Sequence, residues 1–80
     1  MTREGIYERL TTVFREIFDD ENIIVSDITA ASDIDGWDSL AHLNLIIAIE
    51  TAFRIKFSVS DVMSMHHVGD IVTLLQAKGK

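Results

Sequence analysis

The chain of 80 residues contains no cysteine and no proline. Without cysteine there is no disulfide framework, no thiolate metal site and no thiol nucleophile, which excludes a disulfide-stapled secreted mini-protein. The sequence also lacks a signal-peptide pattern at its start and any stretch of about 18 apolar residues. We therefore expect a cytoplasmic protein without membrane insertion. The length predicts one domain, residues 1–80.

Basic residues are scarce and unevenly placed. Seven Lys and Arg stand against thirteen Asp and Glu, a formal net charge of −6, and no Lys or Arg occurs between Arg15 and Arg54. That span holds only acidic charges: Glu16, Asp19, Asp20, Glu21, Asp27, Asp33, Asp35, Asp38 and Glu50. The balance argues against nucleic acid as a partner and against an anionic membrane surface. An acidic patch of this kind favours encounters with basic protein surfaces.

The apolar residues follow helical spacing in four segments, and their share of 48% is enough for a folded core. We expect helices over residues 3–18, 38 or 39 to 53, 59–65 and 68–76. The predicted fold class is all-α: a small four-helix bundle with three longer helices, one short helix and a long first loop.

The long loop, residues 19–37, has an apolar content that a plain linker would not have. We expect these residues to hold it over the core: Ile23, Ile24, Val25, Ile28 and Ile34. A turn of helix is expected near residues 26–31. Strand is the competing interpretation for residues 23–25, although no partner strand is evident.

The second expected helix is unusually apolar, with ten apolar residues among the fourteen from Leu40 to Phe53. An ordinary surface helix has one apolar stripe. This helix is therefore buried by several neighbours, exposed to a partner or lining an internal pocket. In a domain of this size, full burial of one helix is difficult, which favours the other two arrangements.

The usual signatures of catalysis and metal binding are incomplete. Ser39 and His42 are one helical turn apart, but no buried acid is placed to orient the histidine and no nucleophile elbow is present. Residues 33–36 resemble the middle of a calcium loop, yet both its first ligand and its final glutamate are missing. The adjacent His66 and His67 would point apart on a helix. We expect no catalytic residue and no metal site.

The tripeptide Asp38-Ser39-Leu40 precedes the apolar helix and, taken alone, is a good helix cap. A serine at this place would also have its hydroxyl where free backbone N–H groups converge. The helix dipole and those amides would stabilise a phosphate ester on Ser39.

Residues 35–40, with the sequence DGWDSL, resemble the attachment motif of acyl carrier proteins and peptidyl carrier domains. The resemblance continues through residues 45–53 and residues 68–72, and so covers nearly the whole chain. It is carried by the serine, the phase of the helix, Phe53 and the stretch that begins at Val68.

The resemblance implies a carrier protein that is not an enzyme. A phosphopantetheinyl transferase would move 4′-phosphopantetheine from coenzyme A onto Ser39, with Asp38 and Leu40 beside it. The other partners would be acyl-activating, condensing or acyl-transfer enzymes. Leu45, Ile49 and Phe53 would belong to the core, and Ile46 or Ile47 would border an acyl pocket. The partner-facing residues on the second helix would be Leu40, Leu43, Asn44, Ile47 and Glu50.

The sequence departs from the fatty-acid branch of that family at three positions. Ala41 and Asn44 stand where an acid is usual, and Trp37 replaces a small residue. These changes favour a specialised carrier of acyl or aminoacyl intermediates over housekeeping fatty-acid synthesis. We expect a stand-alone monomer, since the sequence begins with Met and shows no linker. The alternative is an acidic helical adaptor that docks partners through residues 38–53 without a prosthetic group.

Overall fold

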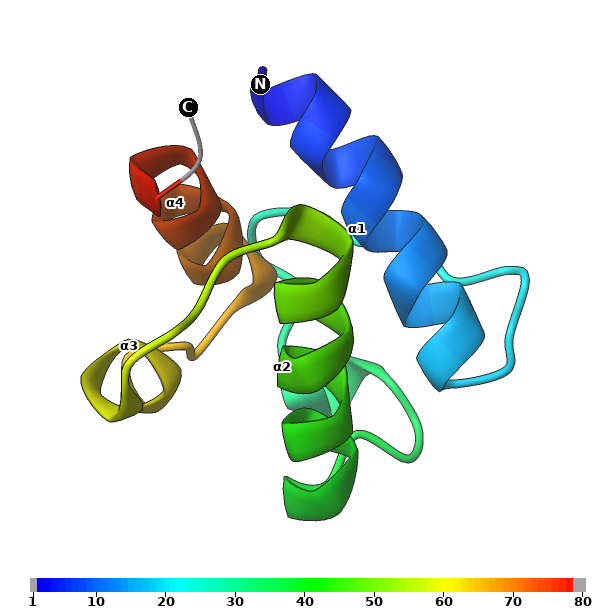
Figure 1. Ribbon diagram of the computed structural model, residues 1–80. Helices are drawn as coiled ribbons and strands as arrows, with labels where there is room; N and C mark the ends of the chain where they lie inside the picture. Colours follow the sequence, from blue (N-terminus) through cyan, green and yellow to red (C-terminus); the bar gives the residue numbers. More distant parts are fainter. Residues whose placement is uncertain (1, 79–80) are drawn as a thin grey trace.

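The computed structural model describes residues 2–78, which form four α-helices and one short 3-10 helix (Figure 1). The elements are α1 (Arg3–Ile17), η1 (Ala31–Asp33), α2 (Ser39–Phe53), α3 (Val59–Met63) and α4 (Val68–Lys78). This confirms the predicted all-α bundle with three longer helices and one short one. The ends differ slightly from expectation, because α3 stops two residues early and α4 continues two residues further.

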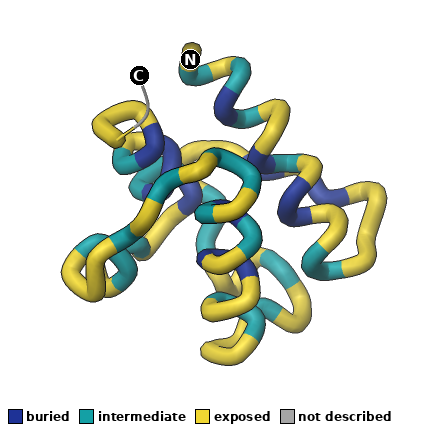
Figure 2. Tube along the Cα trace, in the orientation of Figure 1, coloured by how far each residue is buried: buried dark blue, intermediate teal, exposed yellow. Residues whose placement is uncertain are grey.

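Helix α1 packs against both α2 and α4, and it runs antiparallel to α2 (Figure 1). Thr2 caps α1 by accepting a hydrogen bond from the Gly5 N–H at 3.0 Å. The inner faces of the three longer helices meet in the middle of the bundle (Figure 2). Their most completely buried side chains are Ile6, Leu10, Phe14, Leu45, Ile49, Val68, Ile71 and Val72. The core therefore joins residues from both ends of the sequence.

Helix α3 contributes no fully buried residue and is held by polar contacts. Ser58 and Asp61 form a reciprocal capping box, in which each side chain accepts a hydrogen bond from the other residue's backbone N–H. Lys78, near the end of α4, forms an ion pair with Asp61 at 2.9 Å. The ion pair links the end of α4 to α3, which lies at the edge of the bundle (Figure 1).

The long loop closes over the first turn of α4. The Val68 N–H donates to the carbonyl oxygen of Thr29 at 2.8 Å, and the Gly69 N–H donates to that of Asp27 at 3.0 Å. These bonds satisfy amides that a helix cannot pair within itself. The Asp27 carboxylate also accepts hydrogen bonds from Arg3 and Tyr7 of α1. Burial, followed by the bond to Asp27, raises the pKa of Tyr7 to about 12, so its hydroxyl remains a donor.

The sequence-based description of this loop was partly wrong. Ile23 and Val25 are buried, but Ile24 and Ile28 are 80% and 81% exposed. Residues 23–25 lie outside any helix, and burial alternates along them, since Ile24 is exposed between the buried Ile23 and Val25. The expected helical turn lies later, at η1, where the Asp33 carboxylate accepts the N–H of Ala30.

Gly69 gives the first prediction. A Cβ at this position would lie 2.8 Å from the backbone oxygen of Asp27, which is too close for a normal contact. Gly69→Ala should therefore lower the free energy of unfolding by about 1–2 kcal/mol, although alanine is the better helix former. Urea denaturation measures this. Asn44→Ala, at an exposed position of α2, is the control and should leave stability equal or slightly higher. A Gly69→Ala variant as stable as the parent would contradict the close approach.

Candidate functional site

The site is built around the start of α2, where Asp38 is the N-cap residue. Its side chain accepts a hydrogen bond from the Ala41 N–H at 2.8 Å. Ser39 is consequently the first residue of the helix and is exposed. Since Asp38 does the capping, the serine hydroxyl is not needed for it, and no hydrogen bond within residues 2–78 engages that hydroxyl. The oxygen is accessible beside the free amides of the first turn.

A tight turn leads into this cap. The Trp37 N–H donates to the Ile34 carbonyl at 3.3 Å, and Gly36 between them has φ of 85°. A positive φ at the third position of such a turn favours glycine. The turn reverses the chain just before α2, so that Asp38 can adopt its extended capping conformation.

Trp37 anchors the turn to the rest of the bundle. Its ring packs edge-on against Phe14 of α1, with 5.2 Å between centroids, and stacks on His42 of α2 at 6.0 Å. The indole Nε1–H donates to His42 Nδ1 at 3.1 Å. Burial lowers the pKa of His42, which favours the neutral ring that can accept this bond. The residue that departs from the fatty-acid pattern thus fixes the segment in front of Ser39.

A surface groove of about 560 Å³ opens beside Ser39. It is lined by Ala31, Trp37, Asp38, Ser39, His42, Leu43, Met65 and His66. Sequence reasoning missed Met65 and His66 as members of this site, because the connection between α3 and α4 brings them there and no motif marks them. It considered His42 only as a catalytic base. A serine hydroxyl at the edge of such a groove suits a covalently attached, elongated group.

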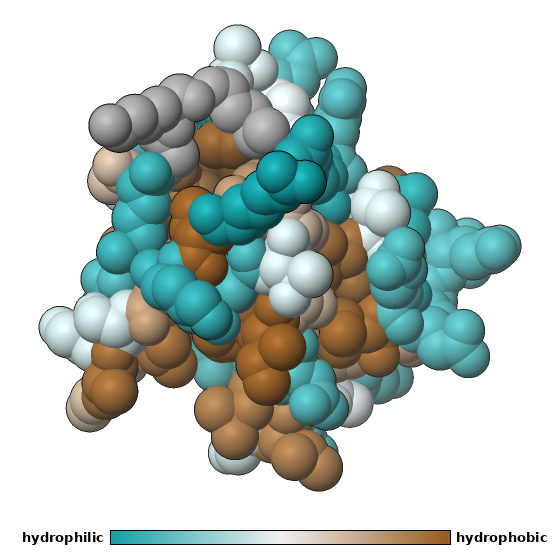
Figure 3. Space-filling view, in the orientation of Figure 1, coloured by the Kyte–Doolittle hydropathy of each residue, from teal (hydrophilic) through white to brown (hydrophobic). Residues whose placement is uncertain are grey.

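The outer face of α2 is apolar and exposed (Figure 3). Leu40, Leu43 and Ile47 are 68%, 56% and 62% exposed, and Asn44 is exposed between them. Helix α3 adds Val59 and Met63, which are 78% and 73% exposed. We call Leu40, Leu43 and Ile47 the α2 stripe. Apolar surface gathered in this way is typical of an interaction site.

The remaining expected residues are placed differently. Leu45 and Ile49 are fully buried and Phe53 is half-buried in the core. Glu50 is half-buried, and its Oε2 accepts the Phe57 N–H at 2.8 Å, so it holds the segment after α2. Ile46 is 6% exposed.

Within residues 2–78 no three His, Asp or Glu side chains are arranged to hold a metal ion. None of the helices in that range is both long and apolar enough to cross a membrane.

Comparison with known proteins identifies the family. No family model matches the chain. It is 28% identical over 78 residues to the acyl carrier protein of Thermotoga maritima, covering 96% of this chain and 95% of that protein. The holo acyl carrier protein of Geobacter metallireducens, solved by NMR in solution, superposes with a TM-score of 0.85. It is 42% identical, and the match covers 90% of this chain and 83% of that one.

The chain belongs to the acyl carrier protein family. The resemblance found in the sequence is confirmed. The protein is accordingly a non-catalytic carrier, and the prosthetic group of the family is a covalent 4′-phosphopantetheine. The exposed Ser39 hydroxyl, the free amides behind it and the adjoining groove together fit such a group.

The contact between Trp37 and His42 gives a prediction of pH dependence. Burial lowers the pKa of His42 from its ordinary value of 6.5. As the pH falls, His42 is therefore protonated in the unfolded chain before it is protonated in the folded protein. The contribution of neutral His42 to the free energy of unfolding is complete above the pKa that His42 has in the unfolded chain. It is lost as the pH falls through the pKa that His42 has in the folded protein. Unfolding free energy should therefore decrease from about pH 7.5 to about pH 5.5. Urea denaturation followed by Trp37 fluorescence measures it, since the chain has one tryptophan.

His42→Asn is the matched variant, because the asparagine side-chain oxygen can accept from the indole without titrating in this range. Its stability should decrease less than that of the parent over the same interval. His66 and His67 are present in both proteins and cancel in the comparison. Parallel pH profiles for the two proteins would show that His42 does not contribute.

Proposed function

We propose that Ser39 is the residue that bears 4′-phosphopantetheine. The observation that carries this proposal is the capping of α2 by Asp38, which leaves Ser39 exposed and its hydroxyl without a hydrogen bond to any residue from 2 to 78. The first-turn amides and the helix dipole stabilise a phosphodiester on that oxygen. Asp38 and Leu40 flank the site as cofactor-proximal residues.

The modification needs one nucleophilic oxygen from this chain. A phosphodiester forms between Ser39 Oγ and the phosphorus that carries pantetheine, while the pyrophosphate bond of coenzyme A breaks and 3′,5′-ADP leaves. The serine proton passes to a base of the phosphopantetheinyl transferase. When bound, the arm supplies a terminal thiol for thioester chemistry, which a chain without cysteine cannot supply itself. The chain's own task is to hold the attachment point in the open.

The α2 stripe and Asn44 form the surface that meets the enzymes which load, extend or remove the cargo. These side chains are on the same helix as Ser39 and on its exposed side. A partner bound to the stripe would therefore have its active site within reach of the arm. Glu50 contributes to this surface only in part, because its carboxylate also holds the Phe57 N–H.

The pathway is a specialised one rather than housekeeping fatty-acid synthesis. Asn44 leaves the centre of the exposed face uncharged, where fatty-acid carriers usually have an acid. Trp37 occupies the position before the cap with a large ring bonded to His42. The cargo would then be an acyl or aminoacyl group of a polyketide, peptide-type, lipid or glycan pathway.

Incubation of the apo protein with coenzyme A and a broad-specificity transferase tests the attachment site. The expected result is an intact-mass increase of one phosphopantetheine, located by peptide mapping to Ser39. Ser39→Ala should show no increase, because no other hydroxyl has this position. Ser60→Ala, at an exposed helical serine of α3, is the control and should be modified like the parent.

Two results would contradict the proposal. Modification that persists in Ser39→Ala would place the arm elsewhere. A parent protein that gains no mass under conditions that modify another acyl carrier protein would favour the alternative function, an acidic adaptor that docks partners through residues 38–53 without a prosthetic group.

Loading by a malonyl-transfer enzyme of fatty-acid synthesis tests the pathway assignment. The holo parent should be a poorer substrate than a housekeeping acyl carrier protein. Asn44→Asp places an acid on the exposed face of α2 and should lower KM about two- to fivefold. This factor corresponds to the free energy of one exposed ion pair. Gln76→Glu makes the same amide-to-acid change on α4 and should leave KM unchanged. Loading of the parent at the housekeeping rate, with no effect of Asn44→Asp, would refute the specialised role.

A further inference from the structure

The basic side chains of this acidic protein are divided into two groups. Arg3 and Lys78 pair with carboxylates, and Arg15 donates from its Nε to a backbone carbonyl. These three tie elements of the fold together. The other basic residues within 2–78 are exposed and form no ion pair with a described residue: Arg9, Arg54 and Lys56.

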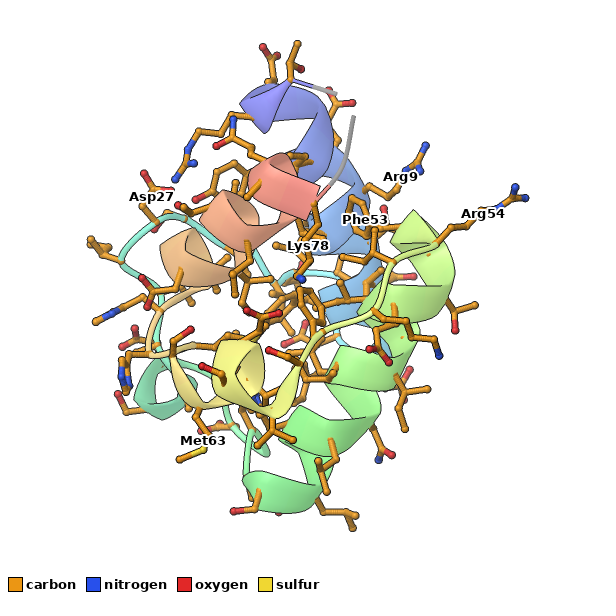
Figure 4. All side chains as sticks on the ribbon, turned by 60° about the vertical axis from the view of Figure 1, so that its left-hand side comes forward. Arg9, Asp27, Phe53, Arg54, Met63 and Lys78 are labelled. Atoms are coloured by element: carbon orange, nitrogen blue, oxygen red, sulfur yellow. The ribbon has the colours of Figure 1, made fainter. Side chains whose placement is uncertain are left out.

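The three unpaired cations gather at the C-terminal end of α2. Arg9 of α1 lies over the ring of Phe53, with 5.7 Å from its Cζ to the ring centroid, and Arg54 follows directly. Figure 4 shows Arg9 and Arg54 extending to the same side of the molecule, near Phe53. We call Arg9, Arg54 and Lys56 the basic end of α2.

A groove of about 330 Å³ adjoins the basic end. Arg54 and Lys56 line it together with Ile47, Ile55, Glu50 and Thr51. Glu50 is the one acid in this lining, and its carboxylate already accepts the Phe57 N–H. Ile47 also belongs to the α2 stripe, so the groove continues the apolar surface that begins next to Ser39.

The backbone at Arg54 is a second unusual feature of this end. Arg54 has φ of 56° and caps α2 in the left-handed conformation, which favours glycine. A cation there complements the helix dipole. The dipole accounts for Arg54. It does not account for Lys56, which lies beyond the helix, or for Arg9, which belongs to α1. A structural role alone therefore does not explain why all three lie together.

We infer that the basic end of α2 docks an acidic, carboxylate-bearing surface of the partner enzyme. This inference rests on the proposed function in one respect, namely that the α2 stripe faces partners. The Ser39 end carries Asp35 and Asp38, so the two ends of the stripe have opposite charge. Helix α2 has 15 residues and is about 22 Å long, well over the Debye length of about 8 Å at physiological salt. The acidic end of α2 thus attracts basic groups of the partner and the basic end attracts acidic groups. Together they fix which way the partner is oriented along the helix.

A protein surface fits these charges better than a lipid or nucleic acid does. Three cations are few against a net charge of −6, so an extended polyanion would also meet the acidic remainder of the protein. The cations also border Ile47 and Ile55, so the complementary surface combines carboxylates with apolar side chains. That mixture is typical of the rim and core of a protein interface.

Peptide titration of the ¹⁵N-labelled apo protein tests the inference without any modification of Ser39. The probes are two amphipathic helical peptides of equal length, one built from Leu and Glu and the other from Leu and Lys. The Leu/Glu peptide should shift the backbone amide signals of residues 47 and 54–56. The Leu/Lys peptide should shift those of residues 35–43.

The double variant Arg54→Gln with Lys56→Gln should weaken Leu/Glu binding about fivefold and leave Leu/Lys binding unchanged. Thr73→Glu with Gln76→Glu has the same net charge at exposed positions of α4, and it should bind both peptides like the parent. The inference is overturned if the Leu/Glu peptide shifts no signal at 54–56, or if vesicles of phosphatidylglycerol shift these signals when the peptide does not. Failure of Ser39 modification leaves this titration unaffected, so the two proposals fail separately.

Discussion

The hydrogen bond from the Ala41 N–H to the Asp38 carboxylate decides where α2 begins, and the rest of the molecule depends on that start. Because a helix has 3.6 residues per turn, Ser39 and the later residues of α2 keep fixed directions relative to one another. With the start at Ser39, Leu45, Ile46 and Ile49 face the core. The α2 stripe then faces outward. If Ser39 were the cap, its hydroxyl would be bonded to the helix.

The long first loop is the second constraint, and it acts through backbone atoms more than through its apolar side chains. Its carbonyls at Asp27 and Thr29 complete the first turn of α4, and Gly69 permits that close approach. At its other end Trp37 is clamped between Phe14 and His42. A loop fixed at both ends can present Asp38 in one conformation. The site is therefore precise although much of it is not in a helix.

Local patterns in the sequence were enough to predict the helices and the cap region with its exposed serine. Each of those features is written within a few neighbouring residues: helical apolar spacing, or an Asp-Ser pair before an apolar run. The exposure of Ile24 and Ile28 could not be read in this way. It depends on which side of the long loop meets the core. The contacts of Gly69 with Asp27, and of Glu50 with Phe57, join residues whose proximity only the folded bundle creates.

The arrangement of charge follows from the same folding. In the sequence the cations merely stand outside the acidic span, which predicts a uniform acidic middle. In the structure two of them are paired, Arg15 donates to a carbonyl, and α1 carries Arg9 to the end of α2. The stripe consequently has an acidic end and a basic end. An apolar stripe alone would admit a partner in either direction along the helix, whereas opposite charges at its ends make one direction attractive and the reverse repulsive. With the arm on Ser39, as proposed, the serine end would face the partner's active site, and this polarity would supply the direction.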